Sequence, residues 1–480
     1  MSSVSDGIFR EYDIRGTFGE DLTPETAELI GRGYAAYIRR LGLYKEGFRV
    51  TIGRDVRTSS NAIFEGLAKG LTDSGIDVIN IGECPTPLQY FSMQTIPCDG
   101  GVMITGSHNP PEYNGFKVSI GKETIHGEEI QKLKKVIREE VIGKKTDAAR
   151  KGSIKEADII APYIDYVSGN IKLPKLKRPL KVVLDSGNGT AGPVAVPLIK
   201  RLGCEVVELF SDPDGRFPNH HPDPTVPKNL KHLMDAVLKE KADFGVAYDG
   251  DADRIGVVDE KGGIIWGDKL MVIFSRSILE KSPGATIVGE VKCSQVMYDE
   301  IAKAGGKPVM WKTGHSLIKA KMKELKAAMA GEMSGHIFFA DKWFGFDDAV
   351  YSSCRLLEIM ANKRAEDPAY PFSKLLEGVA ETIVTPEIRI DCADDVKFEL
   401  IEKLDEAVGA GSKDFKVRDI IKIDGLRINF DGGWALVRAS NTQPVLVLRF
   451  EAADETKLNI AKSFIKGRLE GLRPGIAGGL

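Results

Sequence analysis

The feature that most constrains the fold is a strand–turn–helix–strand pattern that occurs three times along the chain. The copies begin at residues 49, 181 and 285, and each leads from an apolar strand through a polar or Gly-containing turn into an amphipathic helix, a Gly and a second strand. This order is that of the βαβ unit of a parallel sheet. Because the copies are far apart and unequally spaced, the pattern predicts tandem α/β domains and excludes a solenoid of short repeats.

The C-terminal part of the chain has a different pattern. Apolar runs at 426–430, 434–438 and 445–451 are separated by turns, and a helical stretch follows from 454 to 472. Segregated strands and helices indicate an α+β domain, and a chain of 480 residues is too long for one ordinary core. The Gly-rich tail from Arg473 is expected to fray. We therefore predict four domains around a central cleft, three of them tandem mixed α/β domains and the last a C-terminal α+β domain, over residues 1–156, 157–261, 262–370 and 371–480.

The composition limits the classes of function. A net charge of −3 and a pI near 6.3 argue against general binding to nucleic acid or to an anionic membrane, since both need a basic surface. The six scattered cysteines suit a reducing compartment. The N-terminal residues do not have the pattern of a secretory signal, and no apolar run is long enough for a membrane helix. We expect a soluble cytoplasmic protein, a monomer or a weak oligomer, that acts on small molecules.

The segment TGSHNPPEYNGFK (105–117) carries the first candidate site. It lies between two apolar runs, so we predict two strands joined by a loop that its prolines stiffen and that Asn114-Gly115 turns. The loop presents the hydroxyl of Ser107 and the imidazole of His108, and the exit strand presents the ammonium of Lys117. A serine beside a base and a cation suits nucleophilic chemistry. A Pro-rich surface turn whose polar groups satisfy the backbone is an equal alternative.

Three carboxylates alternate along the segment DGDADR, which lies between two apolar strands. Asp249, Asp251 and Asp253 repel one another unless a cation lies among them, and a hard divalent ion such as Mg²⁺ prefers oxygen ligands of this kind. The spacing also matches part of an EF-hand loop, but Arg254 stands where that loop needs Gly and the flanks are predicted strands. The remaining alternative is a solvated acidic turn.

A third loop, Gly187 to Gly192, has the form G-x-G-x-x-G between a strand and a helix. That context is the one in which a dinucleotide-binding fingerprint occurs, so a nicotinamide-dependent oxidoreductase is an alternative function. The structural alternative is a tight strand-to-helix turn in which the glycines avoid steric crowding and Pro193 lies in the first turn of the helix.

Two further loops carry polar side chains that suit a sugar phosphate. In the segment GEMSGH, Glu332, Ser334 and His336 suit hydrogen bonds to neighbouring sugar hydroxyls, and the sequence does not fit the nucleophile elbow of a hydrolase. The segment RASNTQ offers a guanidinium, two hydroxyls and turn N–H groups that could hold a phosphate. A plain loop is the alternative in each case. The polar residues of the second segment are Arg438, Ser440, Asn441 and Thr442.

Together the loops offer a nucleophilic serine, three carboxylate ligands for a metal, polar groups for a sugar and a phosphate-binding loop. These are the groups that phosphoryl transfer on a sugar phosphate requires. Nearly end to end, the chain resembles the α-D-phosphohexomutases, in particular the bacterial phosphomannomutase/phosphoglucomutase branch. The segments that carry the resemblance are FREYDIRG, TIGRDVRTSS, TGSHNPPEYNGFK, FPNHHPDPTVPKNL, DGDADR, TGHSLIKAKM, GEMSGH and RASNTQPVLVLRFE.

The resemblance implies a role for each of these residues. Ser107 would carry the transferable phosphoryl group, and the three aspartates with a phosphoserine oxygen would hold Mg²⁺. His108, Lys117 and Arg15 would surround the reacting oxygen, and Arg254 would adjoin the metal loop. The residues that would bind substrate are Tyr12, Lys292, His315, Glu332, Ser334, His336, Arg438, Ser440, Asn441 and Thr442.

The resemblance also implies a reaction. Hexose 1-phosphate and hexose 6-phosphate would be interconverted through a 1,6-bisphosphate, with glucose 1,6-bisphosphate or its mannose equivalent as activator. Contacts through the sugar O3 and O4 would tolerate both mannose and glucose, which differ at C2. The intermediate would turn around in the cleft, so the fourth domain would have to move. A catalytically silent sugar-phosphate-binding relative is the alternative from another functional class.

Overall fold

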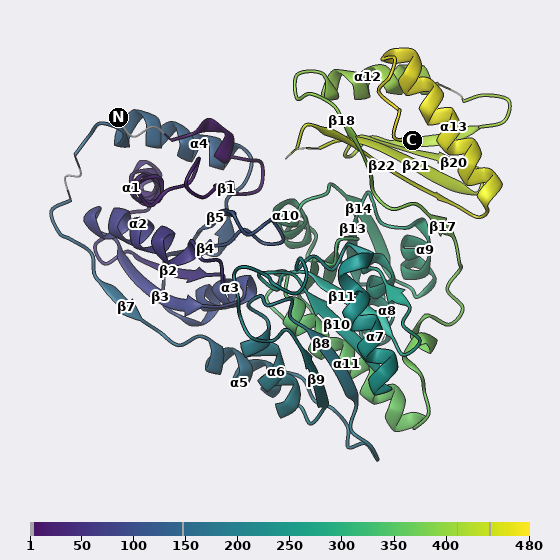
Figure 1. Ribbon diagram of the computed structural model, residues 1–480, viewed down its shortest axis with the longest axis horizontal. Helices are drawn as coiled ribbons and strands as arrows, with labels where there is room; N and C mark the ends of the chain where they lie inside the picture. Colours follow the sequence, from purple (N-terminus) through teal and green to yellow (C-terminus); the bar gives the residue numbers. More distant parts are fainter. Residues whose placement is uncertain (1–3, 146–147, 410, 441–442) are drawn as a thin grey trace. The chain divides into compact units, whose positions relative to one another are not determined.

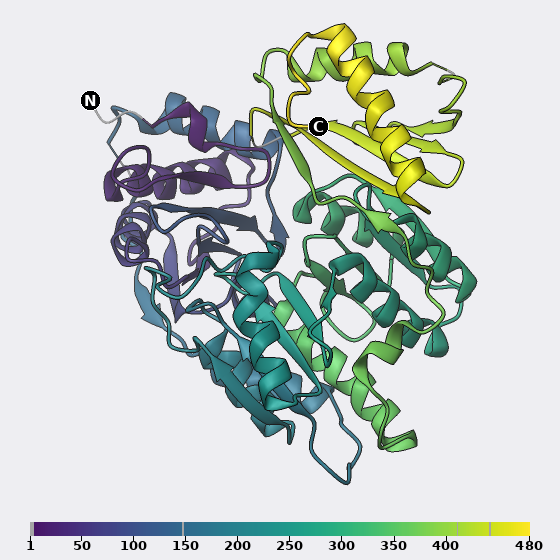
Figure 2. The ribbon, with the colours of Figure 1, turned by 45° about the vertical axis from the view of Figure 1, so that its right-hand side comes forward.

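The chain forms two compact units, shown in Figures 1 and 2. The computed structural model describes residues 4–145, 148–409, 411–440 and 443–480. The first unit comprises Met1–Ser277 and Ser334–Leu375, and the second comprises Ile278–Met333 and Leu376–Leu480. The boundary crosses the GEMSGH segment, so Glu332 belongs to the second unit and Ser334 to the first.

The first sheet of the first unit has the strand order β1-β5-β4-β2-β3-β7, with β6 paired to β5. Strands β4, β2, β3 and β7 are parallel, whereas β5 is antiparallel to both β4 and β1. The strands are β1 (Ile14–Thr17), β2 (Arg49–Arg54), β3 (Asp77–Glu83), β4 (Gly100–Ile104), β5 (Tyr113–Ile120), β6 (Glu123–Thr124) and β7 (Ile154–Glu156). The helices are η1 (Asp6–Ile8), α1 (Pro24–Arg40), α2 (Ser60–Asp73), α3 (Thr86–Thr95), α4 (Glu128–Val136) and η2 (Ile137–Val141).

The alternation of side chains along β2 explains why helices cover both faces of this sheet. Val50 and Ile52 are fully buried in a core with residues of α1, α2 and α4, which lie on one face (Figure 1). Thr51 between them points the other way and accepts a 3.0 Å hydrogen bond from Ser92 of α3. The parallel strands therefore end at one edge of a covered sheet, and the 105–112 loop leaves β4 at that edge.

The second sheet has the order β12-β11-β10-β8-β9. Strands β9, β8 and β10 are parallel, and β10 and β11 form an antiparallel hairpin whose turn carries the DGDADR segment. The strands are β8 (Lys181–Asp185), β9 (Glu205–Leu209), β10 (Phe244–Tyr248), β11 (Ile255–Asp259) and β12 (Ile264–Ile265). The helices are α5 (Ile160–Asn170), α6 (Gly192–Arg201), η3 (Pro227–Leu230) and α7 (Lys231–Glu240). The elements that follow are α8 (Gly267–Lys281), β16 (Ile337–Phe339), α11 (Ala349–Glu366) and η4 (Phe372–Leu376).

The second unit contains a parallel sheet and an antiparallel sheet. In the parallel sheet β13 lies between β14 and β15, and in the antiparallel sheet the order is β17-β22-β21-β20-β19, with β18 paired to β22. Helices α12 and α13 cover one face of the antiparallel sheet, as Figure 2 shows in yellow and light green. The first group of elements is β13 (Thr286–Glu290), α9 (Gln295–Lys303), β14 (Lys307–Trp311), α10 (His315–Leu325) and β15 (Met329–Gly331). The second group is β17 (Ile383–Val384), β18 (Ile388–Asp391), α12 (Lys397–Val408), β19 (Val417–Ile421), β20 (Leu426–Phe430), β21 (Gly433–Ala439), β22 (Val445–Ala452) and α13 (Glu455–Leu472).

The predicted fold class is confirmed, and two local predictions are wrong. Asn114 and Gly115 do not turn the chain but lie inside β5, where a Cβ on Gly115 would come within 2.2 Å of the Ile14 carbonyl of β1. The close approach of the two strands therefore explains the glycine. The tail does not fray, because Glu470 accepts the N–H groups of Gly475 and Ala477 at 2.7 Å each. Among the helices in the described part of the chain, none has the length and apolar character needed to cross a membrane.

Candidate active site

Ser107 lies buried at the carboxyl edge of the first sheet and faces the second sheet's acidic turn. Its Oγ is 3.1 Å from Asp249 Oδ2 and 3.1 Å from His108 Nδ1. Its φ of +50° places it in the left-handed region, which is unfavourable for a residue with a Cβ. The alternative of an exposed Pro-rich turn is therefore excluded for the serine itself, whose exposed fraction is 3%.

The backbone around Ser107 is held by a carboxylate that the sequence analysis missed. Asp55 Oδ2 accepts hydrogen bonds from the Thr105 hydroxyl at 2.9 Å and from the Gly106 N–H at 3.0 Å. The Thr105 hydroxyl in turn accepts from the Ser107 N–H at 2.8 Å. Asp55 follows β2 directly, as Thr105 follows β4, so adjacent parallel strands bring them together. In the sequence, the sign of this role for Asp55 is that a charged residue stands at the end of a predicted buried strand.

The three predicted metal ligands are fully buried and converge. Asp249, Asp251 and Asp253 each offer an oxygen atom, and these atoms lie within 4.8 Å of one another. Asp249 Oδ1 also accepts the N–H groups of Asp253 and Arg254, at 3.1 Å each, which fixes the turn. Asp251 Oδ1 has no hydrogen-bond partner among the described residues. A buried, all-oxygen set with an unused acceptor fits a hard divalent cation.

Charged groups from the first sheet complete this acidic turn. Lys117 of β5 forms ion pairs with Asp251, at 3.1 Å, and with Asp253. Burial alone would lower the pKa of Lys117, but the charges of the two carboxylates raise it well above its usual value, so the amine stays protonated. Burial and the two neighbouring carboxylates raise the pKa of Asp249 well above its usual value. Thr86, another residue that the sequence analysis missed, donates a 2.6 Å hydrogen bond to Asp251 Oδ2.

His108 and Arg15 contact side chains of the serine loop. Burial, followed by the positive charges of Arg254 and Arg15, lowers the pKa of His108 well below its usual value. The imidazole is therefore neutral near pH 7 and can accept a proton. Arg15 forms an ion pair with Asp13 and donates a 3.1 Å hydrogen bond to the side chain of Asn109. A base thus lies beside the serine hydroxyl, and a cation binds the side chain of Asn109 in the same loop.

Arg254 and His336 connect the acidic turn to the GEMSGH segment within the first unit. Arg254 Nε donates to His336 Nε2 at 2.8 Å, so the ring hydrogen is assigned to Nδ1. That nitrogen lies 2.9 Å from Asp347 Oδ2 and 3.5 Å from Asp253 Oδ1. Asp253, His336 and Asp347 form a second buried group whose ligand atoms are close enough for a metal. Tyr12 and Ser334 are half-buried in the same unit.

The second unit contains the other predicted substrate-binding residues. Lys292 Nζ lies 3.2 Å from Glu387 Oε2 and 3.7 Å from Glu290 Oε1. Burial would lower the pKa of Lys292, but these carboxylates raise it. Glu332 Oε1 accepts the Gly314 N–H at 2.6 Å, immediately before the buried His315 that begins α10.

Arg438 is joined to the same group of loops through Asp424. Arg438 Nε lies 3.1 Å from Asp424 Oδ2, which also accepts the Thr313 N–H at 3.0 Å. Ser440 Oγ accepts the Gln443 N–H at 3.2 Å. Asn441 and Thr442 lie outside the described residues. That the residue sets of the two units face one central cleft stays a prediction.

The Gly-rich loop at 187–192 packs against protein backbone. A Cβ on Gly189 would come within 2.7 Å of the Gly250 carbonyl, and one on Gly192 would come within 2.0 Å of the Ser211 carbonyl. Thr190 donates its N–H to the same Gly250 carbonyl at 3.1 Å. The glycines thus serve a strand-to-helix turn that supports the acidic turn, and the oxidoreductase alternative loses its structural basis.

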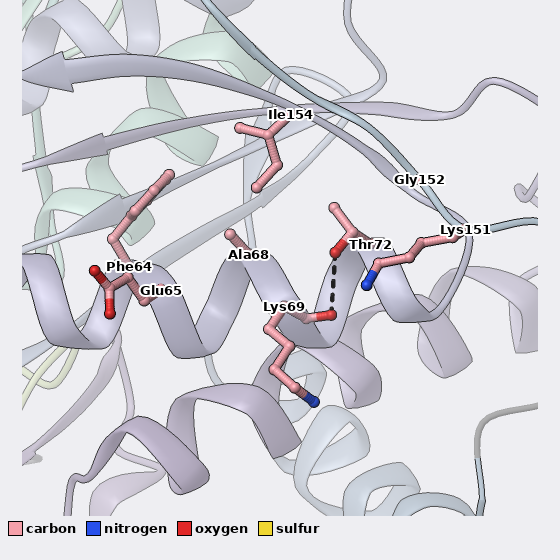
Figure 3. A pocket seen from close by; sticks show the side chains of 8 residues that line it. All are labelled: Phe64, Glu65, Ala68, Lys69, Thr72, Lys151, Gly152 and Ile154. Carbon is pink, nitrogen blue, oxygen red and sulfur yellow. Dashed lines mark hydrogen bonds between the residues drawn. The ribbon is translucent and has the colours of Figure 1, made fainter.

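A surface hollow on the first sheet lies among residues that none of the predictions use. It is lined by α2 and by residues 151–154, as Figure 3 shows. Its two ammonium groups are both paired: Lys69 with Glu28 at 2.7 Å and with Asp73 at 3.1 Å, and Lys151 with Asp73 at 2.9 Å. We assign this hollow no role.

The fold is that of a phosphosugar mutase, and comparison with known proteins supports that class. Family models described as phosphoglucomutase/phosphomannomutase match four consecutive segments. They are α/β/α domain I at residues 6–141, domain II at 161–263, domain III at 266–382 and the C-terminal domain at 387–465. The chain therefore belongs to the phosphoglucomutase/phosphomannomutase family.

Individual relatives agree with this assignment over almost the whole chain. A phosphomannomutase/phosphoglucomutase of Pseudomonas aeruginosa is 46% identical, with 96% of this chain and 95% of that protein covered. A phosphoglucomutase of Neisseria gonorrhoeae is 43% identical, with 98% of each covered. A crystal structure of a phosphoglucomutase/phosphomannomutase family protein from Burkholderia thailandensis has a TM-score of 0.89 at 41% identity, with 99% of each chain covered. The protein is thus an isomerase of hexose phosphates.

Proposed function

We propose that the protein interconverts the 1-phosphates and 6-phosphates of mannose and glucose through a phosphoserine at Ser107 and a hexose 1,6-bisphosphate. One observation carries the proposal: the Ser107 hydroxyl is buried 3.1 Å from both a neutral imidazole and a carboxylate of the acidic turn. A hydroxyl so placed can lose its proton when phosphorus is attacked. The names of the similar proteins from Pseudomonas aeruginosa and Neisseria gonorrhoeae support this choice of sugars.

The proton and the phosphoryl group move in opposite directions. When the serine is loaded, the bond between phosphorus and the sugar oxygen breaks and a bond between phosphorus and Ser107 Oγ forms. The serine proton passes to His108 Nδ1 and ends on the sugar oxygen that leaves, so His108 is unchanged over the step. Lys117 stays cationic and, with the guanidinium of Arg15, would offset the charge around the reacting oxygen. In each cycle the phosphoserine first gives its phosphoryl group to the free hydroxyl of the hexose monophosphate, whose proton passes by way of His108 to Ser107 Oγ. The resulting 1,6-bisphosphate turns and returns its other phosphoryl group to Ser107 by the loading step described above.

Magnesium is the metal we propose for the acidic turn. Asp249, Asp251 and Asp253 fit it, because they are buried, supply only oxygen and leave an acceptor of Asp251 unused. With a phosphoserine oxygen they would complete the ligand set. When bound, the ion would offset the negative charge of the phosphoryl oxygens. Arg254, which donates to His336, would approach the same phosphoryl oxygens.

The substrate-binding roles rest on the second unit and the GEMSGH segment. Glu332 and Ser334 would bind the sugar O3 and O4, so either configuration at C2 fits. Lys292 and His315 would orient the sugar, Tyr12 would line the cleft, and the Arg438 loop, including Ser440, Asn441 and Thr442, would hold the phosphate that does not react. Asp424, the carboxylate that pairs with Arg438, would have to exchange for that phosphate.

The remaining proposals concern organisation and setting. We keep the four domains at 1–156, 157–261, 262–370 and 371–480, and glucose 1,6-bisphosphate or its mannose equivalent as the activator that loads the serine. We also propose a cytoplasmic monomer or weak oligomer that binds neither nucleic acid nor membrane. The six cysteines, all free thiols, support a reducing compartment.

Intact mass spectrometry tests the central step. Dephosphorylated protein is incubated with glucose 1,6-bisphosphate, and isomerisation of glucose 1-phosphate and mannose 1-phosphate is assayed with and without EDTA. We expect one added phosphoryl group on the wild type and on Ser119→Ala, a matched buried serine of β5, but none on Ser107→Ala. Both sugars should turn over, and EDTA should abolish turnover. Equal phosphorylation of Ser107→Ala would refute the assignment, and phosphorylation without turnover would favour a silent sugar-phosphate-binding relative.

A further inference from the structure

The guanidinium of Arg57 is completely buried beneath the loop that carries Ser107. Arg57 follows β2 by three residues, and its side chain has an exposed fraction of 0%. A guanidinium has five N–H donors in a rigid plane. In this protein every one of the five has an acceptor, and four of the acceptors are backbone carbonyls of the serine loop, which extends from Thr105 to Tyr113 at the start of β5.

These four carbonyls span the loop from the serine to its last turn. Nη2 of Arg57 donates to the Ser107 carbonyl at 2.7 Å and to the Asn109 carbonyl at 2.6 Å. Nη1 donates to the Pro110 carbonyl and, at 2.9 Å, to the Tyr113 carbonyl. The loop therefore folds around a single side chain. A lysine ammonium keeps the charge but has three donors at one point, so it cannot reach all four carbonyls.

Asp55 joins this side chain to the N–H side of the loop. Arg57 Nε donates to Asp55 Oδ2 at 3.0 Å, and the same oxygen holds Gly106 and Thr105. Gly106 is required for this arrangement, because a Cβ there would lie 2.5 Å from Arg57 Cζ. Carbonyls and N–H groups of the loop are thus fixed by one buried, charge-balanced pair.

The pair explains how Ser107 keeps an unfavourable backbone conformation. A left-handed φ of +50° at a residue with a Cβ persists only where the surroundings impose it. Arg57 binds the Ser107 carbonyl, and the Thr105 hydroxyl binds the Ser107 N–H. Both peptide groups that flank the serine are therefore held, and its Oγ points to Asp249.

We propose that Arg57 is a positioning residue for phosphoryl transfer, which sets the direction of the Ser107 hydroxyl by clamping four carbonyls of its loop. The proposal rests on the proposed role of Ser107 as phosphoryl carrier. Arg57 acts through the loop backbone, so its loss slows transfer to and from the serine and leaves the affinity for hexose phosphate unchanged. A misplacement of about 1 Å at a reacting atom slows a reaction by about 100-fold.

The test compares Arg57→Lys with Arg54→Lys. Arg54 ends β2 and donates to Asn61 Oδ1 at 2.6 Å and to Asn80 Oδ1 at 3.1 Å, so it is a neighbouring guanidinium with fixed partners that does not bind the serine loop. For each variant we measure the rate of Ser107 phosphorylation by glucose 1,6-bisphosphate, kcat, KM and hydrogen–deuterium exchange of residues 105–115. Gly106→Ala displaces the guanidinium without removing it and serves as the second variant.

Arg57→Lys and Gly106→Ala should both lower the phosphorylation rate and kcat by about 100-fold, with KM within about twofold of wild type and faster exchange confined to the loop. Arg54→Lys should transfer at the wild-type rate. Wild-type rates in Arg57→Lys, or an equal loss in Arg54→Lys, would overturn the proposal. If Arg57→Lys does not fold, Gly106→Ala decides by the same rates. If the wild type is never phosphorylated at Ser107, the proposed function is refuted instead. In that case hydrogen–deuterium exchange alone tests Arg57: unchanged exchange of the loop in both Arg57→Lys and Gly106→Ala would show that Arg57 does not hold the loop carbonyls.

Discussion

Asp348 offers a test of the buried electrostatics of the first unit, away from the reaction itself. Its carboxylate is fully buried at the N-cap of α11, where it accepts the Tyr351 N–H at 2.8 Å and the Tyr163 hydroxyl at 2.8 and 3.0 Å. Burial raises the pKa of Asp348 from 3.8 to about 7, the hydrogen bonds from Tyr351 and Tyr163 oppose the rise, and the adjacent Asp347 adds to it. The replacement Asp348→Asn keeps the acceptor oxygen and removes the titration.

The direction of the effect on stability follows because Asp348 binds its proton more tightly in the folded state than in the unfolded state. Below pH 3.8 the group is neutral in both states and has no effect on stability. As the pH rises towards 7 the unfolded chain gains a solvated carboxylate, and the folded chain loses stability. From the two pKa values the loss is about 2 kcal/mol at about pH 5 and about 4 kcal/mol at about pH 8. From about pH 5 to about pH 8, the free energy of unfolding of the wild type should therefore fall by about 2–3 kcal/mol more than that of Asp348→Asn.

Thermal unfolding at the two pH values measures this difference. For a cooperative unit of roughly 300 residues, it corresponds to about 4 °C in the midpoint of the variant relative to wild type. Asp214→Asn is the control, because hydrogen bonds from Arg216 hold the pKa of that half-buried carboxyl at about 2 and it is ionised at both pH values. If the midpoints of Asp348→Asn and wild type change in parallel from the lower to the higher pH, the raised pKa, and with it the reasoning from burial, is wrong.

Three further predictions concern charged and polar groups of the first unit. Lys117→Met leaves buried carboxylates unpaired and should destabilise the unit by about 3–5 kcal/mol in denaturant unfolding, with partial recovery on adding Mg²⁺; a loss below about 1 kcal/mol would contradict the ion pairs. Thr86→Val removes the donor to Asp251 and should raise the Mg²⁺ concentration for half-maximal activity by about 10-fold or more, and an unchanged titration would exclude a supporting role. Burial would lower the pKa of His220, but its hydrogen bond and charge pairing with Asp185 raise it. The stability that this pairing contributes is therefore complete below pH 6.5 and is lost as the pH rises through the pKa of the folded state. Asp185→Asn should therefore flatten the pH dependence of the unfolding midpoint above pH 6.5, and an unaltered slope would count against the pairing.

The sequence predicted the sheets well because their signals are local. Apolar runs followed by Gly-containing turns mark β2, β8 and β13, and all three are strands that pair in parallel with a neighbouring strand. The same local logic misplaced Asn114-Gly115, because Asn-Gly is a strong turn signal. A glycine that lets two strands approach closely looks identical in sequence to one that turns the chain, and only the pairing of β5 with β1 distinguishes them.

The residues that position the candidate site were harder to predict than the residues that would react. Ser107 and the three aspartates stand out because reactive or like-charged groups are concentrated over a few residues. Asp55, Arg57 and Thr86 are single polar residues after or between strands, and their partners are distant in the chain: Arg57 binds the Ser107 carbonyl across 50 positions. Their burial depends on sheet order, which no local pattern encodes.

The ion pairs of Lys117 have a consequence for how this chain can be divided. The ammonium comes from β5 of the first sheet, and the carboxylates come from the β10–β11 turn of the second, with all three groups buried. Cutting between the two sheets would leave a cation without its counter-ions in one fragment and a set of repelling carboxylates in the other. Neither α/β segment is therefore an independent module: fragments, chimaeras or circular permutants that separate them start with an electrostatic penalty that no choice of linker removes.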